Sequence, residues 1–175
     1  MQPKRDLPPT GGEKKRHLWA ELLFLTWLLG SALGLYYLTF KDYGEFDPEQ
    51  LWLGWQAPTD IGQRLDLAAD ANQVTLVSVR EGGCGCNSYV DAHLQQHASV
   101  NVVEHTPAQL SQLGFVVPAS PMAMVFYGQQ LVYAGPFASG PFCATDNSLI
   151  DDIVNQNVRL AGTFLNGLIK ACRCT

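Results

Sequence analysis

The residues best suited to chemistry in this chain of 175 residues are its five cysteines. Cys84 and Cys86 form a C-x-C pair in a glycine-rich run, Cys172 and Cys174 form a second pair at the C-terminus, and Cys143 lies between the pairs. A cysteine thiolate is both the nucleophile of disulfide exchange and a ligand for soft metal ions. In an oxidising compartment the odd total leaves at least one free thiol, unless it pairs between chains or binds a metal ion.

The first pair lies at the predicted start of a helix. Val74–Val79 is an apolar, β-branched run suited to a buried strand, and Asn87 can cap the following helix. The unpaired N–H groups at a helix N-terminus stabilise a thiolate, and Gly85 allows the tight turn that a Cys84–Cys86 disulfide requires. We therefore expect Cys84 to attack and Cys86 to resolve in dithiol/disulfide exchange. A structural disulfide or a redox-inert remnant of such a site is the alternative.

The rest of the chain must supply the elements that position this turn. Short apolar runs separated by glycine and polar turns indicate strands, and Thr followed by Pro is typical of a helix start. The predicted elements are strands at 100–104, 122–127 and 131–134, and a helix from Thr106-Pro107 through Leu113. A final helical region is capped by Thr145 or Asp146, is interrupted near Asn155–Asn157 and ends before Cys172.

The order of these elements predicts an α/β fold. The first half demands a parallel crossover and the second half supplies antiparallel strands, so we expect a mixed sheet flanked by helices. This order, with cysteines at the first strand-to-helix turn, resembles the thioredoxin superfamily. Val74–Cys84 is similar to that family's first core strand and redox turn. The segment containing Ser120-Pro121, Met124–Gly128 and Val132–Gly135 is similar to its later strand–turn–strand region.

The resemblance covers roughly residues 70–155 and implies a thioredoxin-like domain. It implies that the Ser120-Pro121 bond is cis, faces the cysteines and leaves the backbone of residue 120 free to pair with a substrate chain. Two features depart from the family: the motif is C-x-C rather than C-x-x-C, and Ser78 stands where a buried acid is often found. Glu81 and Glu104 are the candidates for assisting proton transfer in its place.

The N-terminal segment predicts a membrane anchor. Leu18–Phe40 is long and apolar enough to span a bilayer, with Glu21 as its only charge. Basic residues precede the run and acidic residues follow it, which places the N-terminus in the cytoplasm and the C-terminal domain outside. We expect a single-pass protein of a bacterial inner membrane, in contact with lipid, whose C-terminal domain is periplasmic. A signal peptide cleaved near Gly30-Ser31-Ala32 is the alternative.

These patterns divide the chain into four parts. We expect a disordered cytoplasmic tail at 1–17, a transmembrane helix at 18–40, a linker at 41–60 whose tryptophans pack on the domain, and the thioredoxin-like domain at 61–175. Residues 18–175 hold six basic against fourteen acidic residues, so the sequence offers no basic stripe for nucleic acid, and a nucleic-acid partner is not expected.

The same cysteines also allow a metal site. Cys84, Cys86, Cys172 and Cys174 could converge on one soft ion such as copper or zinc, with His93, His97 and His105 as further candidate ligands. This hypothesis predicts a metal-binding chaperone or assembly factor, whereas the exchange hypothesis needs no cofactor.

The C-terminal pair has two further interpretations. It can pass electrons to or from Cys84 and Cys86, or one of its members can form a structural bridge with Cys143. The main prediction is a membrane-anchored periplasmic thiol–disulfide oxidoreductase that acts on protein thiols or disulfides and is recharged by a membrane redox partner. A redox-inactive thioredoxin-like scaffold is the remaining alternative.

Overall fold

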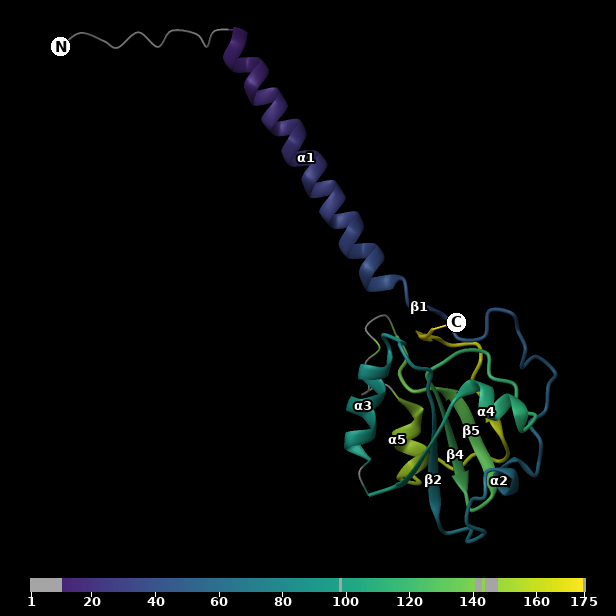
Figure 1. Cartoon of the computed structure of the whole chain (residues 1–175). Helices are drawn as coiled ribbons and strands as arrows, with labels where there is room; N and C mark the ends of the chain where they lie inside the picture. Colours follow the sequence, from purple (N-terminus) through teal and green to yellow (C-terminus); the bar gives the residue numbers. More distant parts are fainter. Residues whose placement is uncertain (1–10, 98, 141–142, 144–147, 175) are drawn as a thin grey trace. The chain divides into compact units, whose positions relative to one another are not determined.

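The computed structural model describes residues 11–97, 99–140, 143 and 148–174, and the chain divides into two units, 1–41 and 42–175 (Figure 1). The first unit holds one helix, α1 (Gly11–Phe40). Its segment His17–Phe40 is long and apolar enough to cross a membrane. Because α1 begins at Gly11, residues 11–17 are helical rather than part of a disordered tail; residues 1–10 lie outside the described residues.

The second unit is built on a mixed five-stranded sheet, as the sequence predicts. The strands are β2 (Val74–Val79), β3 (Asn101–His105), β4 (Met122–Tyr127), β5 (Gln130–Pro136) and β6 (Phe164–Leu165), in the spatial order β3-β2-β4-β5-β6. β3 runs parallel to β2, β4 and β5 form an antiparallel hairpin beside β2, and β6 lies parallel to β5 at the edge.

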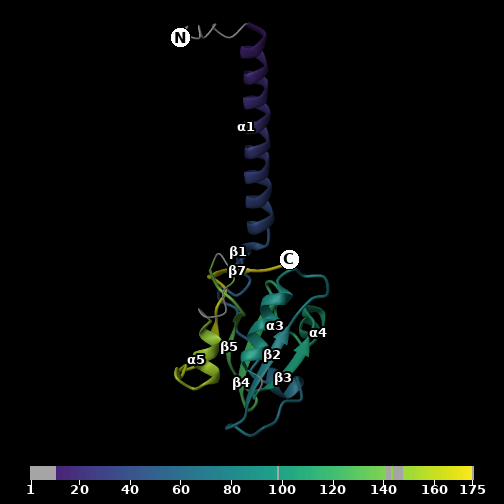
Figure 2. The same ribbon diagram turned by 90° about the vertical axis from the view of Figure 1, so that its left-hand side faces the viewer.

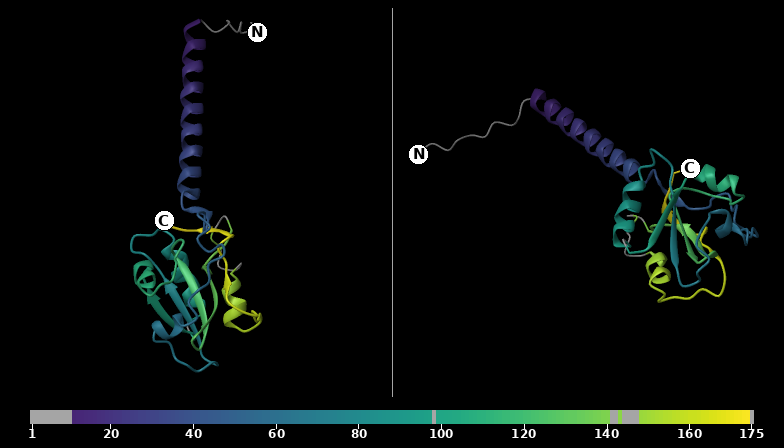
Figure 3. Two further views of the ribbon diagram at one scale, coloured as in Figure 1. Left: turned by 90° about the vertical axis from the view of Figure 1, so that its right-hand side faces the viewer. Right: turned by 60° about the horizontal axis from the view of Figure 1, so that its bottom comes forward.

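Helices cover both faces of this sheet. On one face Val90 of α3 (Asn87–Gln96) and Ile150 of α5 (Leu149–Val154) are fully buried against strand side chains such as Val125. Figure 2 shows α3 in front of the strands and α5 beside β5. On the other face α2 (Ile61–Arg64) and α4 (Pro107–Gln112) bury Ile61 and Leu110; this side turns to the viewer in the left panel of Figure 3. α4 has the cap expected at Thr106 and ends one residue before Leu113.

The segment 43–60 is part of the folded unit and not a linker. Its first residues form β1 (Tyr43–Glu45), which pairs antiparallel with β7 (Lys170–Cys172) near the C-terminus. Phe46 is fully buried, and the indole N–H of Trp52 donates a hydrogen bond to the carbonyl of Val116 at 2.9 Å. The prediction that the tryptophans pack on the domain is therefore confirmed, while the expected boundary at residue 61 is wrong.

The C-terminal region also differs from its prediction. α5 is capped by Ser148 and ends at Val154, so the interruption expected near Asn155–Asn157 is confirmed, but the chain then continues through β6 and β7 instead of a further helix. The reason is local: Gln156 adopts a positive φ of 57°, and the following stretch is rich in Asn, Gly and Thr, which are poor helix formers. The expected caps Thr145 and Asp146 lie outside the described residues.

Candidate functional site

The first C-x-C pair lies where β2 passes into α3, in a turn of residues 80–86 that we call the cysteine turn. Cys86 occupies the N-cap position of α3 without a capping hydrogen bond from its side chain, and Asn87, the expected cap, is the first residue of the helix; Cys84 precedes Cys86 by two positions. The side-chain amide of Asn87 donates a hydrogen bond to the carbonyl of Glu81 at 2.9 Å, which closes the turn. Gly83 has a φ of 82°, a conformation that favours glycine. The predicted position of the cysteines ahead of a helix N-terminus is therefore confirmed.

The cysteine turn forms a disulfide with the end of the chain. Cys84 is bonded to Cys174, and their Cα atoms lie 5.9 Å apart. The pair expected from the sequence, Cys84 and Cys86, is not bonded in this state; Cys86 is a free thiol that is only 1% exposed. The sulfur atoms of Cys84, Cys86 and Cys174 nevertheless lie within 4.8 Å of one another, so all three are within reach of exchange.

Ser120 and Pro121 lie beside this disulfide, and the peptide bond between them is cis, as the resemblance implied. The Sγ atom of Cys84 lies 4.0 Å from the carbonyl oxygen of Ser120. The backbone of Ser120 pairs with Cys174: the N–H of Cys174 donates to the carbonyl of Ser120 at 2.6 Å, and the N–H of Ser120 donates back at 3.2 Å. The C-terminus therefore occupies the backbone position that was expected to receive a substrate chain.

Residues 170–174, which we call the tail, are held there by several contacts. Ala171 of β7 is fully buried, and the N–H of Arg173 donates to the carbonyl of Asp42 at 2.8 Å. A second disulfide joins Cys172 to Cys143, with Cα atoms 5.7 Å apart. A bridge from Cys143 to one member of the C-terminal pair was one of the sequence-based alternatives, and this is the bridge that forms. The cysteine-turn end of the sheet and the tail lie together in all views (Figure 3).

The environment of Cys86 disfavours its thiolate. Burial, and second the negative charge of Asp42, raise the pKa of Cys86 to about 11. A Cβ built on Gly85 would lie 3.6 Å from a carboxylate oxygen of Asp42, so this acid lies directly over the cysteine turn. Cys86 is therefore a protonated thiol at neutral pH, although it lies beside a disulfide.

The two acids proposed from the sequence do not form the core of this site. Glu104, on the edge strand β3, makes an ion pair with Arg80. Glu81 takes part in the cysteine turn only through its backbone carbonyl, which accepts the hydrogen bond from Asn87. Ser78 is fully buried, and its hydroxyl has no hydrogen-bond partner among the described residues. Asp42 is the acid that sequence reasoning missed, because it is brought to the turn by pairing between β1 and the distant β7.

The candidate metal ligands divide into two groups. Three of the four cysteines proposed for a soft ion lie together, but Cys172 is used by the other bridge. His93 and His97 form a cluster with Asp151 rather than with the cysteines. Within the part of the chain that the structure describes, His105 belongs to neither cluster.

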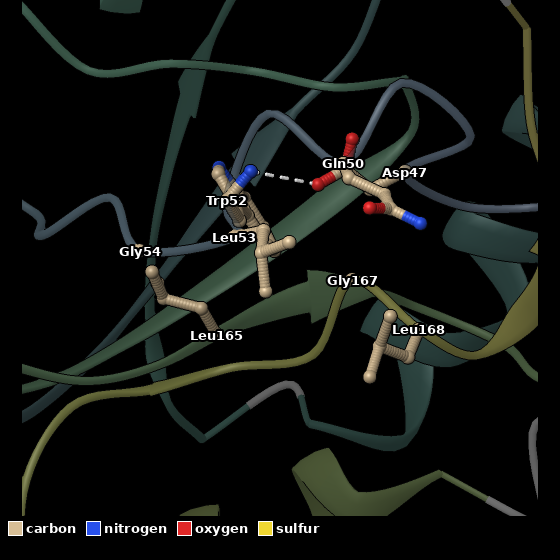
Figure 4. A pocket seen from close by; sticks show the side chains of 8 residues that line it. All are labelled: Asp47, Gln50, Trp52, Leu53, Gly54, Leu165, Gly167 and Leu168. Atoms are coloured by element: carbon tan, nitrogen blue, oxygen red, sulfur yellow. Dashed lines mark hydrogen bonds between the residues drawn. The ribbon is translucent and has the colours of Figure 1, made fainter.

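A pocket of about 290 Å³ lies between the loop 47–54 and the segment 165–168 (Figure 4). Leu53, Leu165 and Leu168 give it a largely apolar lining. Its one acid, Asp47, already accepts hydrogen bonds from the backbone N–H groups of Leu51 and Trp52, each at 2.8 Å. The pocket therefore offers no free charged group for chemistry, and the cysteine turn remains the candidate site.

Residues 55–175 match the protein family described as a domain of unknown function, DUF6436. The chain belongs to this family. The DUF6436 region contains all five cysteines together with Ser120 and Pro121, whereas α1, β1 and Asp42 precede it. No curated protein and no solved structure matches the chain.

Proposed function

We propose that this DUF6436 protein is a membrane-anchored thiol–disulfide oxidoreductase whose exchangeable disulfide joins Cys84 and Cys174. The observation that carries the proposal is the arrangement of that disulfide: it lies ahead of the N-terminus of α3, beside a third cysteine, and against the backbone of Ser120. A purely structural bridge needs neither an adjacent free thiol nor a position at a helix N-terminus.

The fold assigned in this proposal is thioredoxin-like. Its support is the mixed sheet in which β3 is parallel and β4 antiparallel to β2, which agrees with the parallel crossover and the antiparallel hairpin expected from the order of elements that resembles the family. Further support comes from the cis Ser120-Pro121 bond next to the cysteine turn, since the two features come from separate segments of the chain.

The exchange proceeds by two displacements at sulfur. A thiolate of a substrate protein attacks Sγ of Cys84, the bond to Cys174 breaks, and Cys174 leaves as a thiolate that takes up a proton. A second thiolate of the substrate then attacks the substrate sulfur of the mixed disulfide, and Cys84 leaves as a thiolate stabilised by the N-terminal end of α3. The substrate loses two electrons and gains a disulfide, while Cys84 and Cys174 become a dithiol. The reverse direction uses the same steps.

The tail moves aside during the first displacement. Once Cys174 has left, its two backbone hydrogen bonds to Ser120 still hold it beside Cys84, while the Cys143–Cys172 bridge keeps the preceding part of the tail in place. A substrate chain can replace them one for one, because the same donor and acceptor of Ser120 become available. The proposal therefore assigns Ser120 and Pro121 to substrate positioning.

Cys86 clears the mixed disulfide when the second substrate thiol is missing. Its thiolate attacks Sγ of Cys84, the substrate thiolate leaves, and a Cys84–Cys86 disulfide forms without net change in the substrate. The high pKa of Cys86 makes this step slow at neutral pH, which leaves time for the productive displacement.

The proposed location is the outer face of a bacterial inner membrane. α1 supplies the anchor, and the two disulfides of the second unit fit an oxidising compartment such as the periplasm. Protein dithiols or disulfides are the substrate class, and a membrane redox protein that restores the Cys84–Cys174 disulfide is the second partner.

The test is dithiol oxidation by the full-length protein in detergent micelles. With a reduced fluorescent dithiol peptide, we expect Cys84→Ser to lower the rate of disulfide formation by on the order of 100-fold, because it removes the attacked sulfur. The control is the double variant Cys143→Ala/Cys172→Ala, checked for folding by circular dichroism, which should stay within a few-fold of the parent. A Cys84→Ser protein with the parental rate would contradict the proposal and favour a redox-inactive scaffold.

A second candidate function is soft-metal binding by the reduced protein. The observation in its favour is that the sulfur atoms of Cys84, Cys86 and Cys174 lie within 4.8 Å of one another, which suits three thiolate ligands of zinc or copper(I). Metal content after anaerobic reduction separates the two functions: metal retained by the reduced parent and lost in Cys86→Ser supports this candidate.

A further inference from the structure

A second cluster of potential ligands joins the two helices on one face of the sheet. His93 lies in the last turn of α3 and His97 is the residue that follows the helix at its C-terminal end; their ring centroids lie 5.0 Å apart. Asp151 lies in the first turn of α5. Nε2 of His97 lies 2.6 Å from Oδ1 of Asp151, and Nε2 of His93 lies 3.3 Å from the same oxygen. The three side chains offer ligand atoms within 4.8 Å of one another.

His93 is the unusual member of this cluster. Its side chain is fully buried, yet neither ring nitrogen has a hydrogen-bond partner among the described residues, because the 3.3 Å approach to Asp151 lacks hydrogen-bond geometry. One flank of the ring packs edge-on against Phe137. A polar ring buried without a partner costs free energy, so the position calls for an interaction that the described residues do not supply.

The charge state of the cluster suits a cation. Burial lowers the pKa of His93; the negative Asp151 opposes this effect, and His97 adds to it. The lowered pKa of His93 favours the neutral imidazole, which is the form that binds metals. Asp151 supplies one negative charge to offset that of an incoming ion.

The geometry also suits a tetrahedral ion. With bonds of about 2.0–2.1 Å to zinc, neighbouring ligand atoms in a tetrahedron lie about 3.3 Å apart. The pair His93 and Asp151 already has this spacing, and the shorter contact between His97 and Asp151 has to open slightly. The side chain of Asp151 is 31% exposed, which gives an ion access from solvent and leaves room for a water as fourth ligand.

We propose that His93, His97 and Asp151 form a binding site for a divalent transition-metal ion of the zinc type. The ion satisfies the buried ring of His93 and ties α5 to α3, the helix whose N-terminus carries the cysteine turn. The site is separate from the three-cysteine cluster and does not depend on the proposed exchange activity.

The test is zinc binding to the oxidised full-length protein in detergent micelles, followed by calorimetry. The Cys86→Ser background removes the free thiol, so that with both disulfides intact no thiolate competes for zinc. We expect one zinc ion per chain in this background, and a loss of affinity of at least about tenfold on adding Asp151→Asn or His97→Gln. Asp152→Asn, a change of the neighbouring exposed acid, is the matched control and should bind zinc like the background protein.

Cobalt(II) reports on the ligand type. The oxidised protein should show the ligand-field absorption of a tetrahedral nitrogen and oxygen site without a thiolate charge-transfer band. Absence of zinc binding in the Cys86→Ser background would overturn the proposal. Equal zinc affinity in the Asp151→Asn and Asp152→Asn variants would also overturn it, as would a thiolate band that disappears with Cys86→Ser. Circular dichroism checks that each variant is folded. If either Asp151→Asn or His97→Gln fails to fold, the other variant still tests the proposal.

Discussion

Cys84 and Cys86 are two residues apart in the chain but differ in burial and in bonding. Cys84 is half-buried and bonded to Cys174, whereas Cys86 is 1% exposed and carries a proton that burial and Asp42 hold firmly. A free thiol beside a disulfide normally invites rearrangement, since its thiolate is the attacking species. The high pKa of Cys86 therefore protects the Cys84–Cys174 disulfide at neutral pH while keeping a third sulfur within reach.

The alkylation rate of Cys86 tests this account of its charge. Below its pKa the thiolate fraction of a thiol rises about tenfold per pH unit. Because the pKa is raised to about 11, the iodoacetamide rate in the folded, oxidised protein should still be rising between pH 9 and 10. The measurement is mass spectrometry of the singly alkylated protein after short exposures.

The unfolded, oxidised chain in guanidinium serves as the control for that experiment. There Cys86 should behave as an ordinary thiol and its alkylation should level off near pH 9–10. A plateau at the same pH in the folded protein would contradict a buried, high-pKa thiol.

At the scale of elements, the site depends on the pairing of β1 with β7. This short ribbon joins the start of the second unit to its end, and it carries Asp42 and Cys174 to the cysteine turn. The loop that follows β1 is anchored by Asp47, which is 5% exposed and accepts the backbone N–H groups of Leu51 and Trp52. The segment 43–54 is thus a structural support of the site.

Removing that anchor should destabilise the second unit. Asp47→Ala leaves two backbone N–H groups without partners, one of them in a buried contact, and should lower the free energy of unfolding by about 2 kcal/mol. The measurement is urea unfolding followed by tryptophan fluorescence. Glu49→Ala, an exposed acid of the same loop, is the control and should stay within about 0.5 kcal/mol of the parent. Equal effects of the two changes would mean that the loop is a loose tether.

Elements with a strong local pattern were predictable from the sequence. β2 and the hairpin of β4 and β5 follow from their β-branched and apolar runs, and α4 follows from the Thr106 cap, whose side chain and that of Gln109 bond each other's backbone N–H. The cysteine turn and the position of Ser120 and Pro121 beside it follow from the same local patterns together with the resemblance.

Elements that exist only through a distant partner were not predictable. β1, β6 and β7 are two or three residues long and have no periodicity of their own; each forms because an edge far along the chain is available to it. The pairing of Cys84 with Cys174 rather than Cys86 has the same origin, since it joins residues 90 positions apart. The role of Asp42 likewise follows from tertiary pairing alone.

At the scale of the whole molecule, the chain consists of one helix that could cross a membrane and one folded unit that contains every cysteine. Two disulfides in the folded unit fix the tail: one joins Cys174 to Cys84 in the cysteine turn, and the other joins Cys172 to Cys143. The two bridges differ in their surroundings: Cys143 is 3% exposed and its bridge adjoins the buried Ala171, whereas Cys84 and Cys174 are both half-buried and Cys84 precedes the N-terminus of α3. We therefore expect only the second to exchange readily.

The most direct test is the thiol state of each cysteine across a glutathione redox series, determined by alkylation and peptide mapping of the full-length protein. The account predicts that Cys84 and Cys174 open and close reversibly together, while the Cys143–Cys172 bridge stays oxidised throughout. It would be contradicted if the fully oxidised protein held mainly a Cys84–Cys86 disulfide in place of Cys84–Cys174, or if the Cys84–Cys174 bridge stayed closed over the whole series.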